Sequence, residues 1–369
     1  MQSGEAWRRV ASMILTHTSV DRVVEALQAT SWPSEAAQVE LVARVASYID
    51  AYPLSPKYQR YLAKMLSRQV ADEHLTDEFA EFVCVLSHQV PNEGDEDDKC
   101  YFSYLIPRDG NILGKVESDH EDFIAVPLRC LRGHNFVGFR VWTAGMALTE
   151  LLLTRQGREL VEGKHVIELG AGVGVTGVVA AASVRMKSLL MTDFAEEIVE
   201  NLRHSVDINK KHQKCEVIRV EQLDWRAASS REDVEYLYGS GSGGWPDVIL
   251  AADCTYSEDI QSSLVMCIES LLLAAREASN SCPECSREAA ESEGAIALQL
   301  RHGPVAIVAG EVRSESTYAH FLQVLESRPG IEFQDVTQWA LAATEDGRLF
   351  HYERRDKVRF VVIWLDIEP

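Results

Sequence analysis

The sequence predicts an α/β fold, in which a doubly wound parallel sheet is joined to a helical N-terminal region. Three observations predict it. An apolar segment runs into a glycine-rich turn within residues 164–177. From there to the C-terminus, short apolar segments alternate with helix-like ones, as in the β-α units of a parallel sheet. Before that turn, residues 1 to about 90 show helical periodicity.

The N-terminal region is predicted to be a helical accessory domain over residues 1–95. Its apolar residues recur every three or four positions, as on one face of a helix, and Pro33 and Pro53 separate the segments. Core packing explains these positions, and no motif among them indicates chemistry. The stripes comprise Val42, Val45 and Ile49; Tyr58, Leu62, Met65 and Leu66; and Phe79, Phe82, Val83, Leu86 and Val90.

Residues 96–140 are predicted to contain an acidic linker and a β-hairpin. The polar, acidic character begins at residue 91. The segments 101–106 and 123–131 are apolar and typical of strands, and 107–119 turns between them. We expect this hairpin to pack beside the sheet domain.

The glycine turn is the clearest indication of a binding site. Residues 166–169 form a predicted buried strand, Gly170 begins a turn too tight for side chains, and 175–182 form a small apolar helix. A strand, a glycine turn and a helix N-terminus together bring backbone amides close to a nucleotide-like ligand.

The residue before the turn helps to distinguish between cofactors. Gly172, Gly174 and Gly177 also satisfy the dinucleotide spacing GxGxxG, which is a weak signal by itself. Glu168 is poorly placed beside a pyrophosphate but well placed near a cationic amino-acid group. S-adenosyl-L-methionine carries an ammonium and a sulfonium and has no phosphate. Asp193 ends the next predicted strand and suits the ribose hydroxyls of either cofactor.

The remaining elements follow from the same alternation over a domain spanning 141–369. Two polar inserts, 239–244 and about 278–300, are expected to be flexible surface segments. Strands are predicted near 165–169, 188–193, 215–220, 247–252, 305–310 and 358–365, with helices at 144–153, 195–211 and 258–277.

Length and composition exclude several classes of protein. The chain has 369 residues, more than one core usually contains, so two domains are expected. Its net charge of −21 disfavours direct binding to nucleic acid. No apolar run approaches the roughly 18 to 20 residues of a membrane helix, and no secretory signal follows Met1. We expect a cytoplasmic, monomeric protein without a membrane partner.

The cysteines do not indicate a disulfide scaffold or a metal site. Eight cysteines in a chain of this length are too sparse for a disulfide scaffold. Cys282 and Cys285 have a metal-like spacing, but a structural zinc site needs about four ligands and there is no second such pair. We therefore predict an incidental pair and no metal.

Acidic and aromatic residues are predicted to gather at one edge of the sheet. The carboxyl ends of parallel strands share an edge, and ligands bind there in open α/β sheets. Core packing alone explains poorly why several strands end in such residues. Those at or just beyond strand ends are Glu168, Gly170, Asp193, Asp224, Trp225, Asp253 and Tyr256.

These motifs resemble the seven-strand methyltransferases, whose first motif has the form E-x-G-x-G-x-G. More narrowly, the sequence is similar to methyltransferase family 16, the protein-lysine methyltransferases. The resemblance spans about 100–365 and also depends on 141–145 (VWTAG), 223–225 (LDW) and 252–256 (ADCTY), the last with the family's D-x-x-Y signature. It implies a Rossmann-like seven-strand sheet whose terminal strand is antiparallel and lies beside the fifth.

The resemblance also implies roles for the edge residues. Asp193 would hold the ribose, Asp224 would accept from the adenine amino group, and Trp225 would pack on its ring. Helix anchoring or core packing remains an alternative for both tryptophans. The implied cofactor-binding set is Trp142, Glu168, Gly170, Ala171, Gly172, Asp193, Asp224, Trp225 and Ala252.

Asp253 and Tyr256 are assigned to the substrate. Methyl transfer is a displacement at a carbon that the sulfonium already activates, so the enzyme must align donor and acceptor. A lysine, with an ordinary pKa of about 10.4, must lose a proton before it attacks. We assign orientation of that amine to the two residues. A helix cap for Asp253 and a packed ring for Tyr256 are the structural alternatives.

The N-terminal helices favour one substrate. The segment 52–58 (YPLSPKY) and the following helix resemble the elongation factor 2 lysine methyltransferases of the same family. Elongation factor 2 is therefore the expected protein partner, although the helices could equally be a stabilising cap. The alternatives are another protein lysine, such as a chaperone's, a catalytically silent interaction module and, more remotely, a nicotinamide dehydrogenase.

Overall fold

The computed structural model describes residues 3–88, 99–108, 123–131, 137–238, 244–280, 303–345 and 349–366. The chain divides into two compact units, one comprising 1–109, 114–140 and 349–352 and the other 110–113, 141–348 and 353–369. Within the described ranges, no helix has both the length and the apolar content needed to cross a bilayer.

The first unit is built of helices and one hairpin. Side-chain oxygens of Ser34, Ser55 and Thr76 accept a backbone N–H in the first turn of three of the helices, which fixes where those helices begin. The elements are α1 (Ser3–Leu15), α2 (Val20–Leu27), α3 (Glu35–Ala51), α4 (Pro56–Ser67), η1 (Asp72–His74), α5 (Asp77–Ser87), β1 (Lys99–Pro107), β2 (Phe123–Leu131) and η3 (Val137–Phe139).

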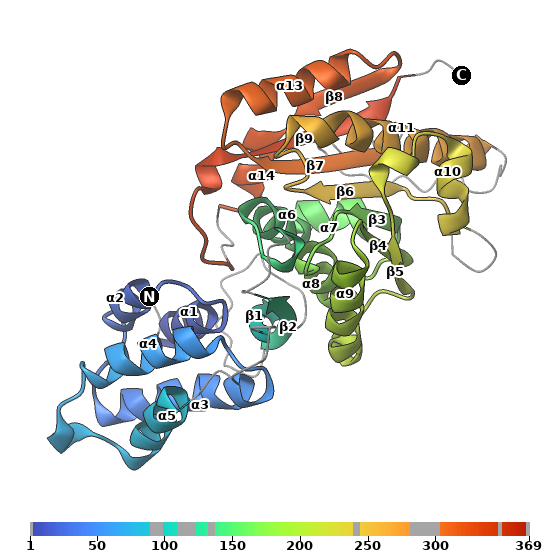
Figure 1. Cartoon of the computed structure of the whole chain (residues 1–369). Helices are drawn as coiled ribbons and strands as arrows, with labels where there is room; N and C mark the ends of the chain where they lie inside the picture. The colour runs from blue at the N-terminus through green and yellow to red at the C-terminus, as the bar shows by residue number, and fades with distance from the viewer. Residues whose placement is uncertain are drawn as a thin grey trace. The chain divides into compact units, whose positions relative to one another are not determined.

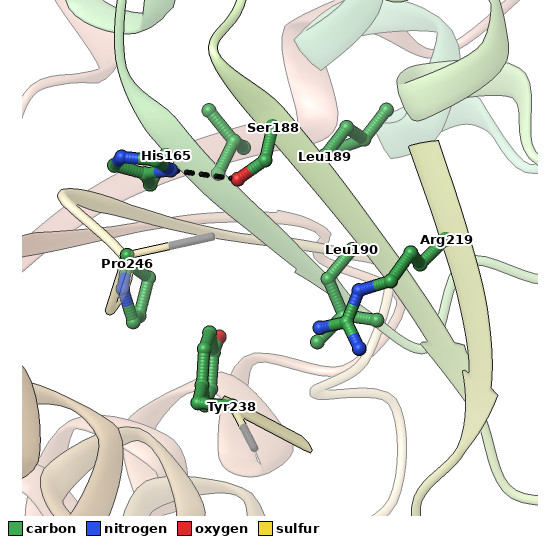
Figure 2. Close-up of a pocket in the computed structure, with 9 residues that line it drawn as sticks. His165, Ser188, Leu189, Leu190, Arg219, Tyr238 and Pro246 are labelled. Carbon is green, nitrogen blue, oxygen red and sulfur yellow. Dashed lines mark hydrogen bonds between the residues drawn. The ribbon is translucent and has the colours of Figure 1, made fainter. Parts of the chain in front are cut away.

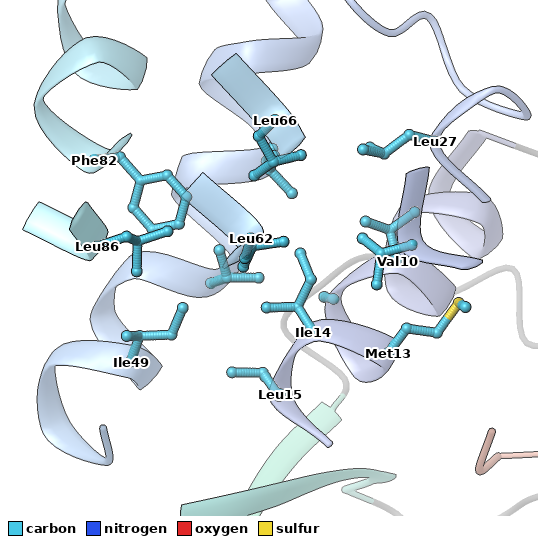
Figure 3. Close-up of a cluster of buried hydrophobic side chains, with 14 of the residues drawn as sticks. Val10, Met13, Ile14, Leu15, Leu27, Ile49, Leu62, Leu66, Phe82 and Leu86 are labelled. Atoms are coloured by element: carbon cyan, nitrogen blue, oxygen red, sulfur yellow. The ribbon is translucent and has the colours of Figure 1, made fainter. Parts of the chain in front are cut away.

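The predicted helical stripes contribute to the core of this unit, which Figure 3 shows around Ile14, Leu62 and Leu66. Val90 of the third stripe lies outside the described residues. The hairpin is confirmed, because β1 and β2 pair antiparallel along their whole length. Its Leu105 and Phe123 join the same helical core. The sequence did not predict that Leu349 and Phe350, far along the chain, are also buried in this unit.

The second unit is a seven-stranded sheet with helices on both faces (Figure 1). The strand order is β5-β4-β3-β6-β7-β9-β8, with β9 antiparallel to both of its neighbours. This order confirms the predicted doubly wound fold and the terminal strand beside the fifth. The strands are β3 (His165–Leu169), β4 (Ser188–Asp193), β5 (Ile218–Gln222), β6 (Val248–Ala252), β7 (Val305–Glu311), β8 (Ile331–Asp335) and β9 (Val358–Leu365).

The helices of this unit pack in two groups. In Figure 1, α10, α11 and α13 lie on one side of the sheet and α6, α8 and α9 on the other. The helical elements of this unit are α6 (Thr143–Leu153), α7 (Arg155–Val161), α8 (Val175–Ser183), α9 (Glu196–Ile208), η4 (Lys210–His212), η5 (Trp225–Ala227), α10 (Arg231–Glu235), η6 (Tyr236–Tyr238), α11 (Glu258–Asn280), α13 (Glu315–Glu326), α14 (Thr337–Ala343) and η7 (Arg355–Lys357).

Several predicted elements differ from the structure, and the helix expected at 195–211 is α9, which ends at Ile208. The third strand was expected at 215–220 and lies at Ile218–Gln222, and β8 was not predicted as a separate segment. Most of both inserts lies outside the described residues, as does the Cys282/Cys285 pair, although α11 continues to Asn280.

Candidate functional site

The candidate site lies where β3 is flanked by β4 on one side and β6 on the other. From β3 the chain continues to β4 and β5 on one side of β3, and it then returns to place β6 on the other side. This is the point where the strand order reverses, and ligands of open α/β sheets bind beyond the carboxyl ends of such strands.

The loop after β3 is held in a conformation that favours glycine. Gly170, Gly172 and Gly174 have φ of 66°, 55° and 89°, in the left-handed region that other residues adopt at a cost. The Gly172 N–H donates to Oδ2 of Asp193 at 2.8 Å, and the Phe194 N–H donates to Oδ1 at 2.8 Å. Burial raises the pKa of the Asp193 carboxyl, and these amides lower it. Asp193 therefore shapes the glycine loop directly.

Gly170 is enclosed by side chains from two other strand ends. A Cβ at this position would lie 2.8 Å from Sγ of Cys254 and 3.1 Å from the indole of Trp225. The Cys254 thiol is buried and donates to the Leu169 carbonyl at 3.3 Å. Because Gly170 has no side chain, the Trp225 indole and the Cys254 thiol pack directly against the glycine loop, and we call this arrangement the cradle. An indole beside a glycine loop suits a flat heterocycle carried by a cofactor.

Glu168 lies inside the protein, against helix α8. Glu168 is 2% exposed, and a Cβ placed on Gly177 would lie 2.5 Å from the Oε2 atom of Glu168. Burial raises the pKa of the Glu168 carboxyl to about 8, while the Thr176 hydroxyl and the Gly177 amide lower it. Its carboxyl group therefore packs against the first turn of α8.

Asp253 directly follows β6 and is tied to the end of β7. Its φ is 58°, its N–H donates to the Ala309 carbonyl at 2.7 Å, and its Oδ1 accepts from the Glu311 N–H at 3.3 Å. Oδ2 accepts from Arg313 at 2.7 Å. Burial raises the pKa of the Asp253 carboxyl and the Arg313 guanidinium lowers it. The carboxylate is held rigidly and does not cap α11, which begins at Glu258.

The Arg313 guanidinium also joins Asp253 to two further groups. It donates to Oε2 of Glu311 at 3.2 Å, and its Cζ lies 4.9 Å from the centre of the Trp142 ring. Trp142 precedes the first residue of α6. A predicted cofactor-side residue and a predicted substrate-side residue are thereby joined by one side chain.

Ala171, Ala252 and Tyr256 are the next predicted site residues. Ala171 donates its N–H to the Thr192 carbonyl at 2.9 Å, and the Ala252 Cβ lies 4.0 Å from where a Cβ on Gly145 would be. Tyr256 is 50% exposed, and burial of its other half raises the pKa of its phenol.

Asp224 is engaged by a neighbour. It accepts from the Arg226 side chain at 2.8 Å and from the Arg226 N–H at 3.0 Å, and this pairing lowers the pKa of its carboxyl. The Arg226 guanidinium in turn lies 5.0 Å from the ring centre of Phe194, which is 54% exposed.

Cys254, Phe194 and Arg226 were not singled out from the sequence. Each is adjacent to a residue that was, namely Asp253, Asp193 and Trp225. Adjacency was the available signal, because each strand end delivers consecutive side chains to the same edge.

A pocket lies at the opposite ends of the strands (Figure 2). His165 and Ser188 begin β3 and β4, and they hydrogen-bond at 2.8 Å between Nδ1 and Oγ. This edge carries none of the predicted site residues. Among the described residues, no group of three or more His, Cys, Asp and Glu could hold a metal ion.

Part of the chain matches a known protein family. Residues 131–293 match the lysine methyltransferase family model. The match covers the glycine loop, the Asp193 strand end and the Asp253–Tyr256 segment, so the resemblance noted in the sequence is confirmed. With the loop geometry, it supports an enzyme of the methyltransferase class and S-adenosyl-L-methionine as its cofactor.

Several named proteins are similar to this segment and its flanks. "Protein-lysine N-methyltransferase EFM3" of Chaetomium thermophilum is 27% identical over 201 residues, 54% of this chain and 56% of its own. "Protein-lysine N-methyltransferase EEF2KMT" of Mus musculus is 25% identical over 315 residues, 82% of this chain and 77% of its own. The chain thus spans less than two thirds of the Chaetomium protein.

Among solved structures, a Thermus thermophilus 16S rRNA N2 G1207 methyltransferase in complex with AdoMet and guanosine is similar with a TM-score of 0.38. It is 15% identical and is matched over 72% of this chain and 50% of its own. That score is low, so the fold assignment depends on the strand order of this chain itself.

Proposed function

We propose that the chain is a protein-lysine N-methyltransferase that transfers methyl groups from S-adenosyl-L-methionine to a lysine of elongation factor 2. The observation that carries the proposal is the arrangement at the ends of β3 and β6. The Gly170 cradle and the Asp253 carboxylate follow adjacent parallel strands. A cofactor in the cradle would therefore lie next to a carboxylate able to hold an amine.

The cofactor, when bound, supplies a methyl group activated by a sulfonium. The chain's own residues have to bind the amine, orient it and keep water away. Asp253 offers a buried carboxylate that attracts a cationic side chain, and Tyr256 offers a half-exposed ring beside the same turn. The amine must still release its proton before attack, and we assign no base to that step.

The choice of elongation factor 2 is supported by the N-terminal region. The similarity to the mouse protein covers 82% of the chain, which is more than the sheet unit alone contains. The proposed substrate rests on this shared helical region and on the segment 52–58. A lysine of another protein, such as a chaperone, is the second candidate.

The test is transfer of label from S-adenosyl-L-methionine to purified elongation factor 2 and, separately, to a cell extract. We expect a labelled lysine in elongation factor 2. Asp253→Asn should lower kcat/KM about 10- to 100-fold and leave cofactor affinity within about threefold, because the group acts on the acceptor. Asp366→Asn, which changes an exposed acid after β9, is the control.

Three results would contradict parts of the proposal. Label in another extract protein but none in elongation factor 2 would replace the substrate. Cofactor binding without any labelled protein would indicate a catalytically silent module. Full activity of Asp253→Asn would remove this residue from the acceptor site.

A further inference from the structure

Arg313 fills a site with the chemistry of a cation-binding pocket. Its guanidinium contacts the Asp253 carboxylate at 2.7 Å, the Glu311 carboxylate at 3.2 Å and the face of Trp142 at 4.9 Å. The two acidic side chains are 4% and 5% exposed. Two buried carboxylates and an aromatic face are the groups that bind an alkylammonium ion.

The same groups include the residue assigned to the substrate amine. In this structure both Asp253 oxygens are engaged, Oδ2 by Arg313 and Oδ1 by the Glu311 amide. An incoming ammonium could not replace the amide, which belongs to the backbone of β7. It could replace the guanidinium, because that side chain is 36% exposed and has several rotatable bonds.

Resting on the proposed function, we propose that Arg313 is an internal place-holder for the substrate's lysine. In the free protein its guanidinium occupies the acceptor site, and the lysine ammonium displaces it on binding. Arg313 is thus a positioning residue that sets how readily a cationic side chain enters the site.

The charge balance of the site explains why a place-holder is needed. A buried carboxylate without a partner is costly, so Asp253 requires a cation before substrate arrives. Glu311 has a second partner, since Nε of Arg354 lies 3.0 Å from its Oε1. When Arg313 leaves, Glu311 keeps Arg354, whereas the ion pairs of the described residues give Asp253 no second arginine or lysine, so Asp253 has the greater need of the ammonium.

The place-holder model predicts that the substrate binds more tightly when the guanidinium is removed. A ligand that must displace an internal competitor binds with an affinity reduced by the occupied fraction. Arg313→Gln should therefore lower KM for elongation factor 2 about three- to tenfold, with kcat within about twofold of the unmodified protein. Arg313→Lys keeps the positive charge and should return KM towards its original value.

The control is Arg328→Gln. Arg328 is also 36% exposed and also pairs with a carboxylate, Glu269, but it lies outside the candidate site. We expect KM and kcat to be unchanged. The assays are run at about pH 9, because burial raises the pKa of Asp253 and it must stay ionised when Arg313 is absent.

A direct measurement of amine binding tests the inference without measuring methyl transfer. n-Butylammonium chloride serves as the probe for a lysine side chain, with n-butanol as its uncharged analogue, and both are titrated calorimetrically into the cofactor-loaded protein. We expect Arg313→Gln to bind n-butylammonium at least threefold more tightly than the unmodified protein or Arg328→Gln. Butanol should distinguish none of them.

The outcomes separate this inference from the proposed function. If the amine ranking holds but no protein is methylated, the place-holder stands and the proposed function fails. If Arg313→Gln keeps its circular dichroism spectrum yet binds the amine equally or less tightly, Arg313 merely supports Asp253. A higher KM in that variant would overturn the inference in the same way.

Discussion

Glu168 is a carboxylic acid whose proton is difficult to remove. It is buried at the end of β3 against α8, and its pKa is raised from 4.5 to about 8. The folded protein therefore binds this proton more tightly than the unfolded chain does. Between about pH 4.5 and pH 8 the folded state loses stability as the pH rises, at most about 1.4 kcal/mol per pH unit.

The variant Glu168→Gln should remove this dependence. Glutamine has nearly the same shape as the protonated acid and cannot ionise. We expect the two proteins to have similar unfolding free energies near pH 4.5, and the variant to be the more stable above pH 8. Urea unfolding at several pH values measures the difference.

The difference between the two proteins is informative because other titrating groups cancel in it. Equal stability of the two proteins at every pH would show that Glu168 reaches solvent. In that case it would be free to meet a cationic cofactor group, as the sequence led us to expect.

At the scale of single residues, the sequence located strand ends better than side-chain partners. Asp193, Trp225 and Asp253 were all predicted from their positions after apolar strands, and each takes part in a contact of the candidate site. The Glu168 side chain packs against α8 instead of facing the edge of the sheet where the candidate site lies. Its direction depends on how the helix packs on β3, and a linear pattern does not contain that information.

At the scale of elements, the glycine loop can be tested with a matched pair of glycines. Gly170 and Gly163 have nearly the same positive φ, 66° and 68°. A Cβ on Gly170 would meet Cys254 and Trp225, whereas one on Gly163 would meet nothing within 4 Å. The two alanine variants share the backbone strain and differ only in the space available.

We expect both variants to lose stability by roughly 1–2 kcal/mol from the backbone alone. Gly170→Ala should in addition lower S-adenosyl-L-methionine affinity by about tenfold or more, because the new methyl group would displace the Cys254 thiol and the Trp225 indole from the glycine loop. Gly163→Ala should bind normally. Calorimetric titration gives the affinities, and equal affinities would show that the cradle is not the cofactor site.

The strand that was predicted least well is β8, which depends on pairing with a neighbouring strand. β8 has one buried residue among its five and, within the described part of the chain, pairs with β9 alone, which follows it in the chain. Its polar composition reflects a sheet edge, so the strand exists because β9 is there to pair with. β3 and β4, by contrast, are buried almost throughout and were predicted within a residue.

At the scale of the whole molecule, the chain has separate hydrophobic cores. One core consists of helix residues with Leu105, Phe123 and Ala125 from the hairpin. Another is formed by the sheet with α11 and α13. The return of Leu349 and Phe350 to the helical unit could not be foreseen, because nothing local distinguishes them from a loop of the sheet domain.

Separate cores predict that cofactor binding protects only one unit. All residues of the cradle belong to the sheet unit. A ligand at a hundred times its Kd stabilises the state that binds it by about 2.7 kcal/mol, which slows global exchange there about 100-fold. In hydrogen-exchange mass spectrometry, we expect S-adenosyl-L-methionine to slow exchange in β3, β4 and β6 but leave α3 and α4 unchanged. At the same cofactor concentration, the slowing in these strands should fall to about tenfold or less in Gly170→Ala. Equal protection of both units in the unmodified protein would mean that they unfold as one.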